Sequence, residues 1–339
     1  MKIAMLHGPR DLRIDEEDLD TTNLADYEVW VKTEISALKI GTDRGNYEGA
    51  EHVPGAPQDY PRWVGDSNLG VVNGVGSKVT RFRVGDRVVS RKFHQSEYVA
   101  EEAGPANLIK VPEGVDSEDA VWSHLYALSF HCYSKGMFTP GENIAVIGLG
   151  VLGLGAVAVG AQIGARVIGL GNSQVRLDMA RKMGAHACFM SDDPDLTSKL
   201  DEFTDGVGID LVILTANPWP AFRTSLEVVR DGGRVSIVSL QGRGEEKLDF
   251  NPLPMELFFI KGISLISISS AQGYLYPGSE PRFGGDRQCR YVLSLMADGK
   301  LAPSQLITHR LKYTEMAQAY EMAYRREKNM LGVIFDWRE

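Results

Sequence analysis

The chain has 339 residues, of which 43% are hydrophobic, and this length and composition predict a globular protein with two hydrophobic cores. Its 36 Lys and Arg residues are outnumbered by 45 Asp and Glu residues, and the resulting formal charge of −9 argues against nucleic acid and anionic membrane surfaces as partners. We find no signal peptide or membrane-spanning stretch and expect a cytoplasmic protein, in which Cys132, Cys188 and Cys289 are too few and too far apart for a disulfide framework or a zinc cluster.

Residues 1–120 contain short apolar stretches separated by Gly and Pro, a pattern typical of a β-rich domain. Alternating apolar and polar residues predict strands at 27–35, 68–75 and 80–88. Residues 54–57, Pro-Gly-Ala-Pro, predict a loop.

Residues 143–147 are apolar and β-prone, and they run directly into three glycines with G-x-G-x-x-G spacing. A small, apolar helical stretch from 151 to 165 follows. The first glycine allows a tight turn, the second lets the backbone approach a pyrophosphate, and the third lets helix and strand pack closely, while the helix N-terminus offers N–H donors. The residues expected to bind the pyrophosphate are Gly148, Gly150, Val151, Leu152 and Gly153.

The glycine spacing alone is weak evidence, but further strands and a helix continue the pattern. A second strand at 165–170 is followed by a charged helix at 174–183, and further apolar strands are expected at 209–215 and 234–240. This alternation predicts a doubly wound parallel sheet, the Rossmann architecture that binds dinucleotides. Thr215 and Ser239, at the ends of the later strands, are further candidate cofactor contacts.

The end of the second strand predicts which dinucleotide binds. An acidic residue there would accept hydrogen bonds from the ribose of NAD, whereas this chain has Gly171, Asn172 and Ser173, followed by Arg176. Asn172, Ser173 and Arg176 can all donate to a 2′-phosphate, so we predict NADP(H). In the alternative interpretation, Asn172 and Ser173 only cap the next helix and Arg176 lies in water.

Residues 262–269, which contain the apolar run 263–268, are predicted to form a strand on the open edge of this sheet. An exposed apolar edge invites pairing, so we expect a homodimer or homotetramer. A surface loop is expected at 271–285, followed by a helix from Asp286, a strand at 306–309, a helix at 314–325 and a strand at 332–335.

Several short strings along nearly the whole chain resemble the medium-chain dehydrogenase/reductase superfamily, which includes the zinc alcohol and polyol dehydrogenases. The strings are Gly41-Thr42-Asp43, Gly70-Val71-Val72, Val84-Gly85-Asp86-Arg87-Val88, Val111-Pro112, Lys182-Met183-Gly184-Ala185, Gly232-Gly233-Arg234 and Leu306-Ile307-Thr308-His309. The resemblance implies a GroES-like β-rich catalytic domain, residues 1–123 and 271–339, with a Rossmann domain inserted at 124–270. It also implies that substrate and nicotinamide meet in the cleft.

The resemblance further implies a catalytic zinc bound by Cys, His and Glu side chains, but the matching positions here hold Ile40, Asp66, Ser67 and His124. Isoleucine cannot bind zinc, and Asp66 and His124 together fall short of the three protein ligands that a catalytic zinc needs. We therefore predict no metal.

Without zinc, another group must stabilise charge on a substrate oxygen. We predict that His124, oriented by Asp66 and with its pKa raised by that carboxylate, handles the proton, with Thr42 and Asp43 beside it. Alternatively, Asp66 caps a local turn and His124 is a core histidine. The candidate substrate contacts are Lys39, Tyr47, Asn68 and His94.

We therefore predict a zinc-independent NADP(H)-dependent oxidoreductase that interconverts a hydroxyl and a carbonyl on a polar small molecule. Two alternatives remain open. The first is conjugate reduction of an enone or quinone, because zinc-free members of the superfamily include such reductases. The second is a nucleotide-binding protein without turnover.

Overall fold

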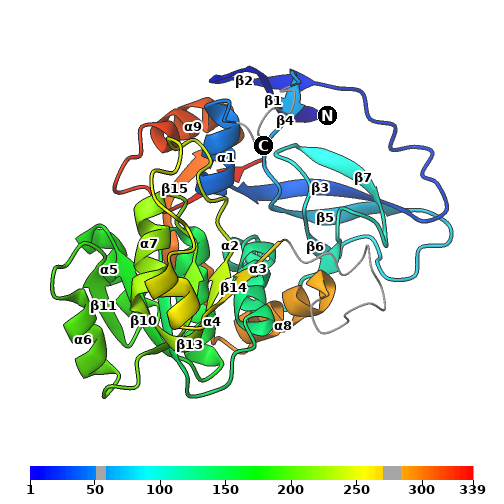
Figure 1. Ribbon diagram of the computed structural model, residues 1–339. Helices are drawn as coiled ribbons and strands as arrows, with labels where there is room; N and C mark the ends of the chain where they lie inside the picture. Colours follow the sequence, from blue (N-terminus) through cyan, green and yellow to red (C-terminus); the bar gives the residue numbers. More distant parts are fainter. Residues whose placement is uncertain (51–58, 270–283, 339) are drawn as a thin grey trace. The chain divides into compact units, whose positions relative to one another are not determined.

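The computed structural model describes residues 1–50, 59–269 and 284–338, and the chain forms two compact units (Figure 1). The first unit comprises Met1–Leu125 and Gln272–Glu339, and the second comprises Tyr126–Ala271. The predicted loop at 54–57 and most of the one at 271–285 lie outside the described residues. Among the described residues, no helix has the length and apolar character needed to cross a membrane.

The first unit contains one sheet of seven strands and one of three. The larger has the order β15-β16-β3-β5-β6-β8, with β7 also paired to β3, and the smaller has the order β2-β1-β4. The strands are β1 (Lys2–Gly8), β2 (Asp11–Glu16), β3 (Glu28–Ala37), β4 (Arg62–Trp63), β5 (Asn68–Val75), β6 (Arg87–Ser90), β7 (Glu97–Glu101), β8 (Ile109–Lys110), β15 (Ile307–Lys312) and β16 (Gly332–Asp336). The helices are α1 (Ile40–Tyr47), α2 (Ser117–Ala120), α8 (Gly285–Ala297) and α9 (Met316–Tyr324).

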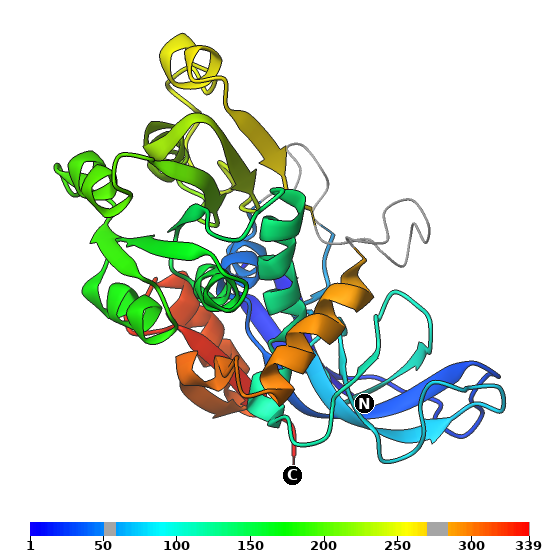
Figure 2. The same cartoon turned by 90° about the horizontal axis from the view of Figure 1, so that it is seen from below.

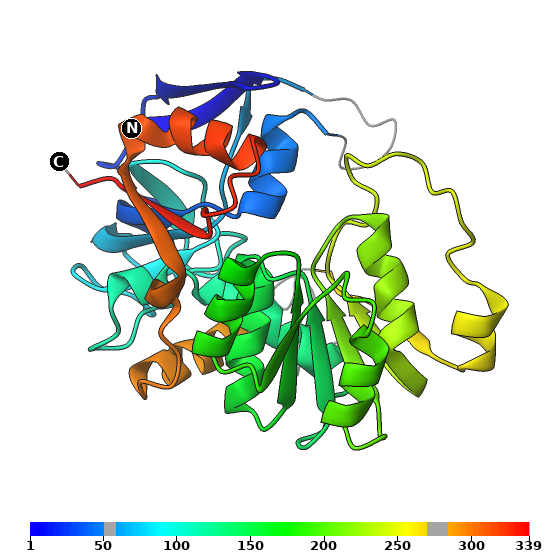
Figure 3. The same ribbon diagram turned by 90° about the vertical axis from the view of Figure 1, so that its left-hand side faces the viewer.

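Hydrophobic cores within the described residues stabilise this unit. Alternate residues of β3, Val29 and Val31, pack with Tyr98 in one core. Another core surrounds α1 and α9, which lie side by side (Figure 3), and the rings of Tyr47 and Tyr320 meet there with centroids 5.5 Å apart. The second core fixes α1, whose first residues carry much of the candidate site.

The second unit is a six-stranded parallel sheet with the order β11-β10-β9-β12-β13-β14. Its strands are β9 (Asn143–Ile147), β10 (Arg166–Gly171), β11 (Ala187–Met190), β12 (Ile209–Leu214), β13 (Val229–Ile237) and β14 (Ser264–Ser267). Its helices are α3 (Ser123–Lys135, most of it in this unit), α4 (Val151–Gln162), α5 (Gln174–Lys182), α6 (Leu196–Phe203), α7 (Trp219–Val228) and a short helical turn at Met255–Ile260. The order reverses between β9 and β12, where doubly wound sheets bind ligands.

Small residues let α4 lie close to its neighbours. A Cβ at Gly160 would fall 2.1 Å from the hydroxyl oxygen of Tyr133, which itself donates to the carbonyl of Ala156 at 2.7 Å. All five residues of β9 are buried, as expected for a central parallel strand. The predicted α/β architecture, a β-rich domain with an inserted doubly wound sheet, is confirmed.

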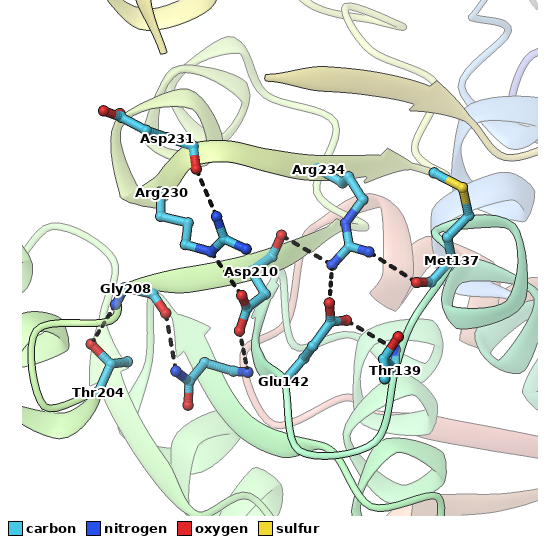
Figure 4. Close-up of polar contacts among 10 residues, drawn as sticks. Met137, Thr139, Glu142, Thr204, Gly208, Asp210, Arg230, Asp231 and Arg234 are labelled. Atoms are coloured by element: carbon cyan, nitrogen blue, oxygen red, sulfur yellow. Dashed lines mark hydrogen bonds and ion pairs between the residues drawn. The ribbon is translucent and has the colours of Figure 1, made fainter. Parts of the chain in front are cut away.

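Charged side chains join the amino ends of the parallel strands (Figure 4). Asp210 accepts from the backbone N–H of Asn143 at 2.8 Å and from Arg230 Nε at 2.7 Å. Arg234 pairs with Glu142 and donates to the carbonyl of Met137 at 2.9 Å. Because the strands are parallel, this network lies at the end of the sheet opposite the glycine turn, so we assign it to stability.

The predicted strand at 80–88 is largely wrong, because only its end, within β6, pairs with a neighbour. The preceding residues form turns, and carboxylate side chains accept hydrogen bonds from their backbone N–H groups in place of a neighbouring strand. The Glu102 carboxylate accepts from the backbone N–H groups of Thr80 and Arg81 at 3.2 and 3.0 Å, and the Asp86 carboxylate accepts from that of Arg83 at 3.1 Å. Carboxylates that satisfy the backbone in this way compete with strand pairing.

Candidate functional site

The glycine turn lies at the carboxyl end of β9, at the reversal of strand order. Gly148 has φ +96°, and a Cβ there would fall 2.7 Å from Thr215 Oγ1 and 2.8 Å from the backbone nitrogen of Ala216. Thr215, just beyond β12, donates its hydroxyl to the Gly148 carbonyl at 2.6 Å. Thr215 therefore holds the glycine turn in place.

The other two glycines differ in the space around them. A Cβ on Gly153 would lie 1.8 Å from the Gly148 carbonyl oxygen, so only glycine allows this close packing of helix and strand. A Cβ on Gly150 would meet only Arg176 Nη1, at 3.8 Å, which leaves open space beside the backbone. Gly150 is the N-cap of α4, so the first N–H groups of the helix, at Val151, Leu152 and Gly153, have no partner within it. This turn fits the pyrophosphate of a dinucleotide.

The residues after β10 leave two polar side chains close to the glycine turn. Ser173 has the N-cap position of α5, yet its side chain makes no capping hydrogen bond, and its buried hydroxyl has no partner among the described residues. Arg176 donates to the Leu149 carbonyl at 2.9 Å and does not extend into water. Neither side chain behaves as the capping interpretation expects, and Asn172 is exposed beside them.

Two further residues predicted to contact the cofactor, Gly171 and Ser239, contact other parts of the second unit. A Cβ at Gly171 would meet Leu149 Cδ1 at 2.9 Å, so this glycine serves packing beneath the turn. Ser239, just beyond β13, accepts a hydrogen bond from Gln241, which also donates to the Ala216 carbonyl at 2.7 Å.

The first unit contains a compact group of charged side chains around the start of α1. Lys39 Nζ lies 2.7 Å from Asp66 Oδ1, and Arg91 Nη2 lies 3.8 Å from Asp66 Oδ2. Burial opposes the charge of Asp66, but Lys39 and Arg91 hold its pKa below the usual range. Lys39 and Arg91 thus keep a partly buried carboxylate ionised.

Asp43 connects the two backbone segments that carry this ion pair. One carboxylate oxygen accepts from the backbone N–H of Lys39 at 2.8 Å, and the other accepts from that of Gly65 at 3.3 Å. The side chain is 2% exposed. Burial, together with the charge of Asp66, raises the pKa of Asp43 to about 7.

His124, near the start of α3, belongs to the same group. Burial, reinforced by the positive charges of Arg91 and Lys39, lowers the pKa of His124 to about 3. The predicted rise in its pKa is therefore wrong, because burial of the imidazole outweighs the opposing effect of the Asp66 carboxylate. His124 is a neutral imidazole whose buried Nε2 has no hydrogen-bond partner among the described residues.

His94 is also buried and neutral, and burial lowers its pKa to about 3. Its Nδ1 is hydrogen-bonded to Ser36 Oγ at 2.7 Å, and that hydroxyl also accepts from Trp337 Nε1 at 2.9 Å. The ring lies so close to Gly65 that a Cβ there would fall 2.5 Å from it. His94 therefore supports the loop that carries Asp66.

The other residues predicted to contact the substrate, Tyr47 and Asn68, form hydrogen bonds within the protein. Tyr47 donates its hydroxyl to Glu321 at 3.2 Å within the core of α1 and α9. The amide of Asn68 donates to Thr33 Oγ1 at 3.0 Å and to the Phe93 carbonyl at 3.2 Å. Thr42 is exposed on α1, next to Asp43 in sequence.

The side chains present do not fit a catalytic zinc. Ile40 packs against the core of α1 and α9, and Ser67 donates its hydroxyl to the Val121 carbonyl at 2.7 Å. Asp66 already binds an ammonium group. Within the described part of the chain, no three His, Cys, Asp or Glu side chains are grouped to hold a metal.

Sequence reasoning missed two members of this group, Arg91 and Tyr320. Arg91 follows β6, and no motif marks it. Tyr320 lies on α9, more than two hundred residues after Asp43 and Asp66 along the chain, and burial with these two carboxylates raises its pKa well above the usual value. Only the packing of α9 against α1 brings it to the site.

Two family models match consecutive parts of the chain. The alcohol dehydrogenase GroES-like domain matches residues 25–158, and the zinc-binding dehydrogenase domain matches residues 151–278. Together they span most of both units.

Individual relatives agree with these matches. The chain is 27% identical to a sorbitol dehydrogenase of Halalkalibacterium halodurans over 346 residues, covering 93% of each chain. It is also 27% identical over 245 residues to the NADP-dependent isopropanol dehydrogenase of Entamoeba histolytica, covering 72% of this chain and 61% of that protein. The crystal structure of galactitol-1-phosphate dehydrogenase from Escherichia coli superimposes with a TM-score of 0.82 at 21% identity, covering 99% of this chain and 100% of that one.

Proposed function

Because the chain belongs to the medium-chain dehydrogenase/reductase superfamily, as an oxidoreductase of the alcohol and polyol type, we propose that it interconverts a hydroxyl and a carbonyl on a polar small molecule with NADP(H) and without zinc. NADP(H) supplies or accepts the hydride. The protein binds the dinucleotide on the glycine turn, and the charged group around Lys39 and Asp66 binds the substrate.

The preference for NADP(H) rests on one observation at the end of β10. No carboxylate lies there to repel a 2′-phosphate, and Arg176 is held beside the glycine turn by its bond to the Leu149 carbonyl at 2.9 Å. The buried, unpartnered hydroxyl of Ser173 and the exposed amide of Asn172 are further donors. A 2′-phosphate would receive charge-assisted hydrogen bonds from this set.

The proposal of zinc independence rests on the side chains that stand at the positions expected for zinc ligands. Ile40 and Ser67 have partners that exclude them as ligands, and Lys39 neutralises Asp66 at 2.7 Å. A zinc ion at this place would have to displace the lysine ammonium and would still lack a third ligand.

The substrate contacts follow from the same group. The buried Nε2 of neutral His124 is available for a hydrogen bond to a substrate oxygen. Thr42 is exposed on α1 and is assigned the relay of a proton to water. A charged and polar group of this kind suits a polyol or hydroxy ketone better than an apolar quinone.

A cofactor and substrate panel tests this function. Purified protein is assayed with NADP⁺ and with NAD⁺ against sorbitol, xylitol and 2,3-butanediol, and with NADPH against the corresponding ketones and a set of enones. We expect oxidation of at least one polyol that is faster with NADP⁺. Metal analysis of protein purified without chelator should find less than stoichiometric zinc, and a chelator should leave the rate unchanged.

Three results would contradict the proposal. Reduction of enones but not ketones would assign the chain to conjugate reduction. Tight NADPH binding without turnover of any compound would indicate a binding protein. Stoichiometric zinc whose removal abolishes activity would show that the donor set is completed in another way.

A further inference from the structure

The proposed function leaves one chemical question open at the substrate oxygen. Hydride transfer to a carbonyl places negative charge on its oxygen, and a dehydrogenase without a metal needs another positive group there. Resting on the proposed function, we propose that the ammonium group of Lys39 binds this oxygen and supplies the proton that completes the alcohol.

The position of Lys39 carries this inference. Its Nζ lies 2.7 Å from Asp66, the residue at a position where the resemblance expects a zinc ligand. The lysine side chain is 13% exposed and that of Asp66 is 31% exposed, so the pair is partly desolvated yet open to a small molecule. An ammonium held by one carboxylate still has two N–H donors available for a substrate oxygen.

Asp43 holds the backbone around the Lys39–Asp66 ion pair in place. Its two oxygens accept from the backbone N–H groups of Lys39 at 2.8 Å and Gly65 at 3.3 Å. Gly65 directly precedes Asp66, so one buried carboxylate sets the backbone of both partners of the ion pair. Asp43 is therefore a positioning residue, and the ion pair is held in one arrangement before substrate binds.

The other cations and bases near the site are less suited to this role. His94 and His124 are buried and neutral, so neither carries a positive charge to the oxygen at neutral pH. Arg91 is charged but does not release a proton. Lys39 alone among these four side chains combines a positive charge with a proton that it can transfer.

The step balances in both directions. In reduction, the hydride of NADPH forms a C–H bond at the carbonyl carbon and the C=O π electrons move to oxygen, while a proton passes from Lys39 Nζ to that oxygen. NADPH becomes NADP⁺, the ketone becomes an alcohol, and neutral Lys39 regains a proton from water. In oxidation, Lys39 first releases a proton to water, and the resulting amine then accepts the hydroxyl proton as hydride leaves for NADP⁺.

Substitution of Lys39 tests this role with a matched ion pair as control. The probe is the fastest of D-fructose, D-xylulose and dihydroxyacetone with NADPH. We expect K39M to lower kcat by about 10²–10⁴-fold, with little change in the dissociation constant of NADPH. The control is K110M, which breaks the Lys110–Asp86 pair of 2.6 Å in the same unit, and its kcat should stay within about twofold of the unsubstituted protein.

Chemical rescue separates a catalytic from a structural lysine. Added ethylamine should restore part of the kcat of K39A, because its ammonium form can enter the space that the side chain leaves. K39R should stay well below the unsubstituted protein, since its guanidinium keeps the charge but not the transferable proton. The double variant K39M/D66N, which leaves no unpaired carboxylate, should melt at the temperature of the unsubstituted protein and remain as inactive as K39M.

Several outcomes would overturn the role of Lys39 while leaving the proposed function intact. They are a K39M enzyme with an unchanged kcat and only a raised KM, a fully active K39R enzyme, and a K39A enzyme that no amine rescues. An unsubstituted protein that reduces none of the ketones would instead contradict the proposed function, and the role of Lys39 with it.

Discussion

The glycine turn of the second unit and the charged group of the first unit were both inferred from short motifs, but the structure agrees with them to different degrees. At the turn, Gly148 and Gly153 have the conformations and close contacts that their spacing predicts. In the charged group, the expected pairing of His124 with Asp66 gives way to a Lys39–Asp66 ion pair. A motif that encodes backbone geometry is more informative than one that encodes side-chain partners.

The largest expected effect is on the turn itself. We expect G153A to lower the free energy of unfolding by about 3 kcal/mol or more and to abolish NADPH binding, because its Cβ would overlap the Gly148 carbonyl. G150A is the matched control, since its Cβ meets only open space. It should unfold like the unsubstituted protein in urea yet bind NADPH more weakly. Equal stability of the two variants would contradict the assigned roles.

The second prediction concerns the pH dependence of the charged group. Folding raises the pKa of Asp43 from 3.8 to about 7, so the folded protein binds more protons than the unfolded chain between these values. The contribution of Asp43 to stability is therefore complete below about pH 4 and is lost as the pH rises through 7.

The D43N variant measures this contribution. The stability of the unsubstituted protein relative to D43N should be higher at pH 5 than at pH 8, by about 1–3 kcal/mol in urea titrations. D43N should also lower kcat at pH 8, because one backbone acceptor of the Lys39 and Gly65 segments is lost. A stability difference that does not change with pH would show that Asp43 remains ionised.

The third prediction concerns cofactor choice. We expect R176A to weaken NADPH binding by about 1–3 kcal/mol, the scale of a charge-assisted hydrogen bond, and to leave NADH nearly unchanged. The control is R223A, which removes an exposed arginine of the same unit that pairs with Glu227. Calorimetric titrations with equal losses for both dinucleotides would assign Arg176 to the glycine turn rather than to the 2′-phosphate.

The smallest effect on chemistry is expected at the edge of the parallel sheet. The prediction of an edge strand is confirmed, since β14 ends the strand order, whereas pairing of two copies there remains a proposal. In Figure 2, β14 (yellow) lies at the end of the row of strands. Apolar residues of the neighbouring turn are exposed as well, Phe259 by 77%.

We therefore propose a homodimer formed through β14, and light scattering tests it. I266K should shift the mass from dimer toward monomer, because a buried lysine at the edge opposes pairing. V207K changes an exposed residue elsewhere in the same unit and should leave the mass unchanged. A monomeric unsubstituted protein would contradict the proposal.

Most of the second unit could be predicted because its signals are local. Continuous apolar runs marked the parallel strands, and the missing carboxylate after Leu170 was visible in the chain itself. The prediction of a strand at 80–88 was wrong because the carboxylates of Glu102 and Asp86 accept hydrogen bonds from backbone N–H groups there. Such competition leaves no periodic signal in the sequence.

The sequence by itself determined that this chain carries a dinucleotide turn and that Ile40 cannot bind a metal, because both follow from what single residues can adopt or donate. Only the tertiary structure decided which charges meet. Lys39 and Asp66 are brought together by the buried carboxylate of Asp43, and Tyr320 arrives on α9 from the far end of the chain. The protonation state of His124 depends on burial and on two neighbouring cations, and distances in space, not along the chain, set both.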